Sequence, residues 1–99
     1  RMMAAGLRDL LILPEDYVLM VACKDEVDTA ILGALREAGP NGKQTGKLAV
    51  EFGIDHRDVS RRIYAMNKRM RDEMEEAIII KHDGKWRLVK KLRRDFAKD

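Results

Sequence analysis

The segment GIDHRDVSRRIYAMNKRM, residues 53–70, combines the start of a helix with two different helix faces. Gly53 suits the left-handed turn that separates two helices, and the Asp55 carboxylate can cap the first turn of the helix that follows. From there apolar side chains recur every three or four residues, which is the spacing of one buried helix face. The segment therefore predicts an amphipathic helix over residues 55–76. Its expected buried residues are Val59, Ile63, Met66, Met70 and Met74.

The opposite face of this helix is basic and carries one aromatic ring. Its residues step by three or four positions, so they form one exposed stripe along the helix. Lysine and arginine neutralise phosphates, while hydroxyl and amide groups can add hydrogen bonds to a nucleic-acid backbone. No acidic residue lies between positions 59 and 71, so we expect little local charge compensation. The stripe consists of Arg57, Arg61, Tyr64, Lys68 and Arg71, with His56, Ser60 and Asn67 alongside.

Two shorter helices are expected upstream of this one. Residues 25–38 place apolar side chains on one stripe, Asp25 can cap the first turn, and Gly39 ends the helix. Residues 45–52 form the next helix, with Thr45 as its expected cap. Its buried residues are Leu48, Ala49 and Phe52.

Downstream, the apolar pattern changes from helical to β-prone. The runs at 78–81 and 85–89 flank Asp83 and Gly84, a dipeptide typical of two-residue hairpin turns. Three helices followed by a hairpin is the order of a winged helix. We therefore expect an α+β fold with a three-helix core, a C-terminal β-hairpin wing and an additional apolar N-terminal segment.

The predicted wing adds further candidate binding residues. Lys81, Lys85 and Arg87 alternate with apolar residues and are expected to face outward, where they can reach phosphates. Trp86 is expected to close the helical core as a lid while presenting one edge to a ligand. The wing and the long helix together make up the predicted binding surface.

The ends of the chain differ from the domain between them. Residues 1–24 form an apolar N-terminal extension, residues 25–90 the winged-helix domain, and residues 91–99 a basic tail expected to be a frayed or docking helix. The extension is too apolar for a free linker, so it must cover the core or meet a partner. Homodimerisation or a protein partner through residues 7–22 is therefore an open alternative.

The charge is distributed unevenly along the 99 residues, whose net charge is +3. Residues 1–53 carry six Lys or Arg against eight acidic residues, and residues 54–99 carry fourteen against nine. A basic half joined to an acidic half suggests a face for a polyanion.

The sequence lacks the patterns of catalysis and of metal or cofactor binding. Cys23 is the single cysteine, which excludes an intrachain disulfide and fits a reducing, intracellular compartment. His56 and His82 are too far apart to suggest a zinc site. The pair Ser60 and His56 has no orienting acid, so we expect a protein that is not an enzyme and has no cofactor. No apolar run approaches the roughly 20 residues that span a bilayer, so no membrane role is expected.

A helix-turn-helix pattern supports the expected fold. Ala49, Gly53 and Val59 have the spacing A-x3-G-x5-V, which resembles that motif. With the hairpin and Trp86 added, residues 25–90 resemble the winged-helix superfamily. In that superfamily the third helix usually enters the major groove, and the wing contacts the backbone or the minor groove.

Residues 31–66 are also similar to the Z-nucleic-acid-binding (Z-alpha) domains. In those domains the third helix reads K-x-x-N-R-x-L-Y, and a tryptophan follows. The tyrosine of that family stacks near a syn base and packs against the tryptophan, so the resemblance implies these roles here. Serine replaces the family's asparagine, and HDGK replaces a proline pair in the wing. The matching positions are Arg57, Ser60, Arg61, Tyr64 and Trp86.

These observations predict a non-catalytic domain that binds duplex nucleic acid, with DNA as the expected duplex and transcription regulation as the expected role. Two alternatives remain: recognition of Z-form DNA or RNA, and a protein-interaction winged helix within a larger assembly. The second is favoured by the apolar N-terminal segment and by acidic residues at the end of the long helix. A solvated basic helix face is the simplest competing interpretation. The acidic residues are Asp72, Glu73, Glu75 and Glu76.

Overall fold

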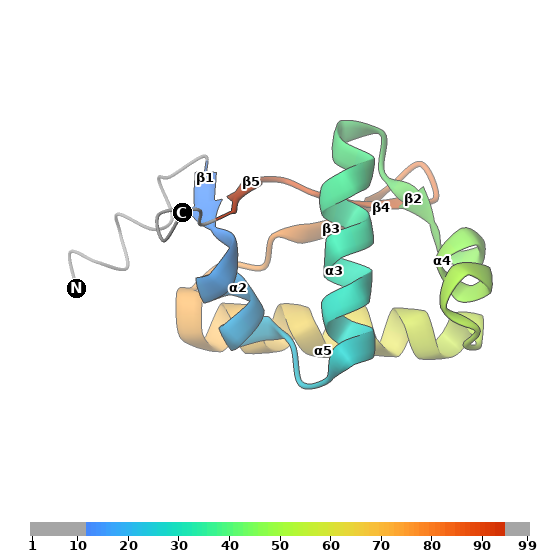
Figure 1. Ribbon diagram of the computed structural model, residues 1–99, viewed down its shortest axis with the longest axis horizontal. Coiled ribbons are helices and arrows are strands. Elements are labelled where there is room, and N and C mark those ends of the chain that lie inside the picture. Colours follow the sequence, from blue (N-terminus) through green and yellow to red (C-terminus); the bar gives the residue numbers. More distant parts are fainter. Residues whose placement is uncertain (1–11, 95–99) are drawn as a thin grey trace.

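The computed structural model describes residues 12–94, so residues 7–11 of the predicted partner segment and residues 95–99 of the predicted tail lie outside the described residues. The elements are β1 (Ile12–Pro14), α2 (Glu15–Ala22), α3 (Glu26–Ala38), the 3-10 helix η1 (Gly39–Asn41), β2 (Lys43–Gln44), α4 (Thr45–Phe52), α5 (His56–Met74), β3 (Ile79–His82), β4 (Lys85–Leu88) and β5 (Lys91–Arg93) (Figure 1).

The helix boundaries follow the local signals in the sequence. Asp25 caps α3 by accepting a hydrogen bond from the Asp28 N–H at 2.9 Å. Asp55 caps α5 by accepting from the Arg57 N–H at 2.8 Å. Gly53, with φ 64° and ψ 38°, makes the left-handed turn between α4 and α5. The long helix ends at Met74, two residues before the predicted end.

The core lies where the three predicted helices meet. Figure 1 shows α3 crossing α5 and α4 lying near the N-terminal end of α5. All five apolar residues predicted for the inner face of α5 are buried, as are Leu48 and Ala49 of α4. This confirms the predicted helical core, except that Phe52, which the sequence predicts to be buried, is half-buried at its edge. From α3 the core receives Ile31, Leu32 and Leu35.

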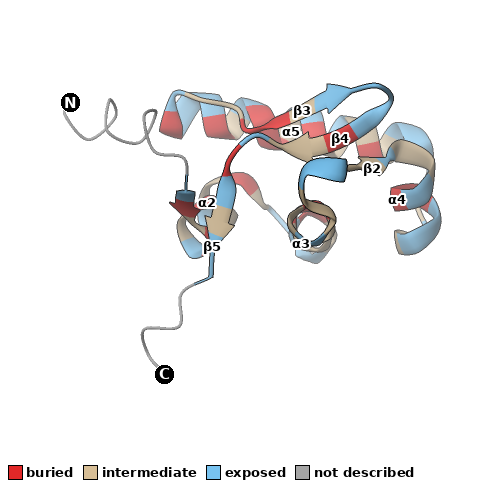
Figure 2. Cartoon of the chain, turned by 90° about the horizontal axis from the view of Figure 1, so that it is seen from above, coloured by how far each residue is buried: buried red, intermediate tan, exposed pale blue. Residues whose placement is uncertain are grey.

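The predicted hairpin is formed by β3 and β4. Asp83 and Gly84 both have positive φ, at 54° and 76°, as a tight two-residue hairpin turn requires. The hairpin turn is exposed, whereas α5 has buried residues at regular intervals (Figure 2). Helices followed by this antiparallel hairpin give the winged-helix topology predicted from the sequence. β2 adds a third strand in the order β2-β4-β3, which the sequence does not reveal because β2 has only two residues.

The described part of the apolar N-terminal segment covers the core. Leu13, Val18 and Ala22 are buried, and α2 packs along α5. The Arg69 Nε donates a hydrogen bond to the Ala22 carbonyl at 2.8 Å, which joins the end of α2 to α5. Residues 12–22 therefore belong to the same core as α3, α4 and α5.

The prediction of a helical basic tail is wrong for its first residues. Residues 91–93 form β5, which pairs in parallel with β1 in the register Ile12 to Lys91. Just before it, Lys90 is buried and its Nζ lies 2.8 Å from Glu76 Oε1. A strand forms here because β1 provides backbone hydrogen-bond partners that a helix could not use.

Candidate nucleic-acid interface

The centre of the predicted surface is a contact between two aromatic rings. Trp86 of β4 is 3% exposed, and Tyr64 of α5 is 63% exposed. Their ring centroids lie 5.8 Å apart with the planes at 85°, an edge-to-face arrangement. Trp86 thus closes the core as predicted, and it also supports an exposed ring on α5.

Lys81 adds a cation beside the same pair. It lies directly across from Trp86 in the hairpin, and its Nζ is 5.4 Å from the centroid of the Trp86 ring. Strand residues directly opposite each other share one face of a sheet. Lys85 and Arg87, which alternate with Trp86, therefore leave β4 on the other face. Lys81 and Lys85 are exposed and Arg87 is half-buried, so the hairpin carries its cations on two faces.

Most of the predicted stripe is exposed along α5. The Arg57 side chain is 95% exposed, that of Arg61 74%, and that of Lys68 71%. His56 and Arg71 are also exposed, while Ser60 is half-buried. Together with Tyr64, these residues place cations and one aromatic ring along the outer side of a single helix.

The prediction that Asn67 belongs to this stripe is wrong. Asn67 is 7% exposed, its Nδ2 donates to the Ile79 carbonyl at 2.8 Å, and its Oδ1 accepts from the Ile79 N–H at 3.3 Å. The side chain faces the hairpin because the first residue of β3 supplies both a donor and an acceptor there. Asn67 therefore joins α5 to β3 and cannot contact a ligand.

The prediction of little charge compensation is also wrong. The Arg61 guanidinium contacts the Asp58 carboxylate, and Lys68 Nζ lies 3.1 Å from Asp72 Oδ2. Both acids lie just outside the interval 59–71, but positions three and four residues apart are neighbours on a helix. In both pairs the cation is exposed, and such pairs at a helix surface contribute at most about 1 kcal/mol, so a phosphate can replace the carboxylate.

Two other arginines of α5 point inward and form a network around the buried carboxylate of Asp28. Arg62 Nη1 lies 2.9 Å from one oxygen of Asp25 and 2.9 Å from Asp28 Oδ1. Arg69 Nη2 donates to Asp28 Oδ2 at 3.1 Å. The Asp28 side chain is only 3% exposed, and both arginine side chains are less than one-third exposed. These two cations hold α5 against α2 and α3.

The network shifts the pKa of its members in opposite directions. The hydrogen bond from the Asp28 N–H, followed by that from Arg62, lowers the pKa of Asp25. Hydrogen bonds to Asp25 and Asp28 raise the pKa of Arg62. Each group thus favours its charged form.

One residue of the site has a role that sequence reasoning missed. Thr45 is the predicted cap of α4, but Gln44 occupies the N-cap position and Thr45 is the first residue of the helix. Its hydroxyl oxygen instead accepts a hydrogen bond from the Trp86 Nε1–H at 2.9 Å. No sequence signal reveals this contact, because the two residues are 41 positions apart.

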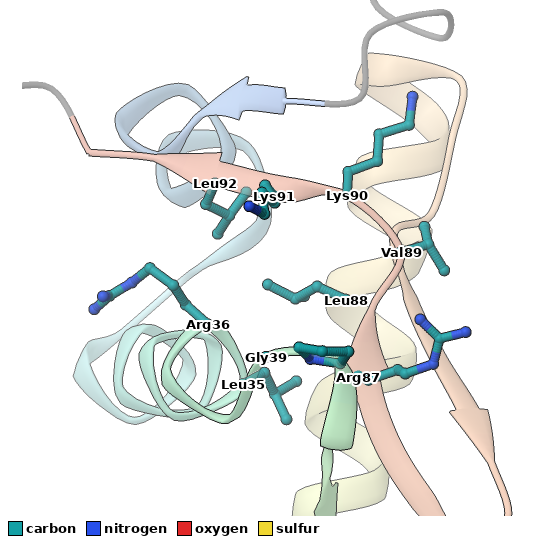
Figure 3. A pocket seen from close by; sticks show the side chains of 10 residues that line it. Leu35, Arg36, Gly39, Arg87, Leu88, Val89, Lys90, Lys91 and Leu92 are labelled. Atoms are coloured by element: carbon teal, nitrogen blue, oxygen red, sulfur yellow. The ribbon is translucent and has the colours of Figure 1, made fainter.

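The groove beside the crossover from β4 to β5 brings together no set of catalytic groups. It measures about 420 Å³, and apolar side chains of Leu35, Leu88 and Leu92 line it. In Figure 3, Lys90 runs toward α5 and the Arg87 guanidinium points away from the leucines.

Elsewhere, burial raises the pKa of the Cys23 thiol to about 11, which keeps it protonated and unreactive at neutral pH.

Within residues 12–94, His, Cys, Asp and Glu side chains form no group of three or more that could hold a metal ion. The helices in this part of the chain are all too short or too polar to cross a membrane. No protein-family model, curated protein or solved structure matches the chain.

Proposed function

We propose that this protein binds duplex nucleic acid, without catalysis, through the outer side of α5 and the hairpin face that carries Trp86 and Lys81. DNA is the expected duplex, and regulation of transcription is the role that this activity suits. The observation that carries the proposal is the exposed Tyr64 ring, which is supported from behind by Trp86 and flanked along α5 by exposed cations.

The dimensions of α5 suit a groove. Its 19 residues span about 28 Å, and an α-helix fits the major groove of B-form DNA. Arg57, Arg61 and Lys68 are spaced so that they follow one side of the helix. Tyr64 lies between them, where its ring can contact a sugar or a base. Cations alone would fit a solvated helix face, but a large exposed aromatic ring in their midst favours a ligand.

The direction of docking follows from the charges at the two ends of α5. Its C-terminal end is close to Asp72, Glu73 and Glu76, which would repel phosphates. The N-terminal half carries Arg57 and Arg61 and lies beside α4. We therefore place the ligand over α5 from Arg57 to Lys68, away from its acidic last turn, and over Lys81 of the hairpin.

Binding of left-handed duplexes is the second candidate. The perpendicular contact between Tyr64 and Trp86 favours it, because the resemblance to Z-alpha domains implies that their tyrosine and tryptophan pack together. A protein partner through residues 7–22 has weaker support, since Leu13, Val18 and Ala22 are already buried in the core of this domain.

Fluorescence anisotropy with labelled duplex DNA, duplex RNA and an alternating CG duplex at two salt concentrations tests the proposal. We expect affinity to fall steeply with salt, because phosphate contacts release counterions. Replacing Arg61→Ala together with Lys68→Ala should weaken binding about ten-fold. The control Lys24→Ala with Lys91→Ala removes the same charge from exposed positions away from Tyr64, and it should have a much smaller effect. Equal losses in the two double variants would contradict the assigned surface.

Tyr64→Ala separates the two candidates. Recognition of a left-handed duplex predicts selective loss on the CG duplex, together with loss of the inversion of its circular dichroism spectrum. Equal loss on all duplexes would favour ordinary groove or backbone binding.

A further inference from the structure

The indole of Trp86 is fixed from several directions. Lys43 of β2 is its backbone partner on one side, and Lys81 of β3 is its partner on the other. The Thr45 hydroxyl accepts the hydrogen bond from its Nε1 at 2.9 Å. Because the N–H of a buried indole needs an acceptor, this hydrogen bond defines which way the ring plane faces.

The orientation of the Tyr64 ring depends on the plane of the Trp86 ring. The two rings make an edge-to-face contact, with centroids 5.8 Å apart and planes at 85°, and Tyr64 is otherwise largely exposed. An exposed tyrosine without such a neighbour samples several rotamers, and ordering it on binding costs free energy. The orientation of the indole therefore sets the orientation of the exposed ring.

We propose that Thr45 is a positioning residue for nucleic-acid binding: its hydroxyl fixes the Trp86 indole, and the indole presents Tyr64 to the ligand. This inference rests on the proposed function, because that proposal assigns the ligand contact to Tyr64. Thr45 acts through Trp86 and not by touching the ligand. The start of α4 thereby affects recognition by α5.

Two substitutions at position 45 isolate the hydroxyl. Thr45→Val keeps the branched shape and removes the acceptor, whereas Thr45→Ser keeps the hydroxyl. We expect Thr45→Val to weaken duplex binding about five-fold, which corresponds to one hydrogen bond of ordinary net strength. Thr45→Ser should bind like the unsubstituted protein. Thr29→Val is the matched control, because the Thr29 hydroxyl donates to the Asp25 carbonyl at 3.1 Å, away from the two rings.

A spectroscopic measurement reports on the rings without any ligand. Trp86 is the only tryptophan in the chain, so near-ultraviolet circular dichroism is sensitive to its packing. Thr45→Val should weaken this signal while the far-ultraviolet spectrum stays unchanged. Thr45→Ser and Thr29→Val should preserve both spectra.

A double-mutant cycle with Tyr64→Ala distinguishes positioning from direct contact. The five-fold effect of Thr45→Val should disappear when Tyr64 is already alanine. An equal effect in that background would overturn the inference, as would unchanged affinity of the single variant Thr45→Val. If the unsubstituted protein shows no salt-dependent duplex binding, the proposed function fails and the inference fails with it. If the unsubstituted protein and Thr45→Val both bind normally, the inference about Thr45 fails while the proposed function stands.

Discussion

Arg61 and Arg62 are neighbours in α5, yet their guanidinium groups lie in different surroundings. Arg61 is 74% exposed and contacts only Asp58 on its own helix, whereas Arg62 is 22% exposed and joins α5 to Asp25 and Asp28. Lys68 and Arg69 repeat the contrast two turns later, with side chains that are 71% and 28% exposed. Adjacent residues of the same charge thus divide between an exposed helix face and a structural network.

The exposed and the inward-pointing cations differ in whether they can exchange their carboxylate partner for a phosphate. An exposed cation paired on its own helix can leave its carboxylate for a phosphate at little cost. A cation that satisfies a buried carboxylate cannot, because that carboxylate would lose its partners in a poorly solvated place. Formal charge along the helix therefore overstates the charge that a ligand can reach.

Removing the buried acid should have the largest effect on stability. Asp28→Ala takes away the partner that Arg62 and Arg69 share and should lower the free energy of unfolding by about 3 kcal/mol. Asp72→Ala, which removes the exposed partner of Lys68, should stay within about 0.5 kcal/mol. Urea denaturation of the two variants measures both values. Similar midpoints would show that Asp28 is not the centre of a stabilising network.

A comparison of adjacent residues should give a smaller effect. Arg69→Ala loses the hydrogen bonds to Ala22 and Asp28 and should cost about 2 kcal/mol. Lys68→Ala should change the free energy of unfolding by no more than about 0.5 kcal/mol. For duplex affinity we expect the opposite: when both variants are fully folded, Lys68→Ala should weaken binding more than Arg69→Ala. Thermal melting measures the stability of the two variants, and anisotropy on the same samples measures their affinity. A variant Lys68→Ala that loses as much stability as Arg69→Ala would contradict the separate roles of the two residues.

The pH dependence of stability should give the smallest effect. The pKa of Asp25 is lowered in the folded protein by the Asp28 N–H and by Arg62, so its contribution is present above the pKa of the unfolded chain. That contribution is lost as the pH falls through the lowered pKa of the folded state. Asp25→Asn keeps a capping side chain but cannot ionise. Its melting temperature should lie below that of the unsubstituted protein at neutral pH and converge with it in acid. A constant gap across the acid range would contradict the assigned role of the carboxylate.

The sequence by itself determined the elements whose signals are local. Asp25 and Asp55 cap α3 and α5, Gly53 makes the turn between two helices, and Asp83 with Gly84 closes the hairpin. Each depends on residues within a few positions, so composition and spacing are sufficient to predict it. The exposure of Tyr64 and of the outer cations follows from the same helical period, as does the burial of the opposite face.

The tertiary structure alone decided the contacts between residues far apart in the chain. Asn67 turns inward toward Ile79, Arg62 reaches Asp25 across 37 positions, and Thr45 meets Trp86 across 41. The pairing of β1 with β5 joins the two ends of the described chain. A polar side chain points toward whatever donor or acceptor the fold brings near it, and residue type alone does not state which one that is. The helical period thus predicts which side of α5 is polar, but only the packing of neighbouring elements decides which polar groups remain available to a ligand.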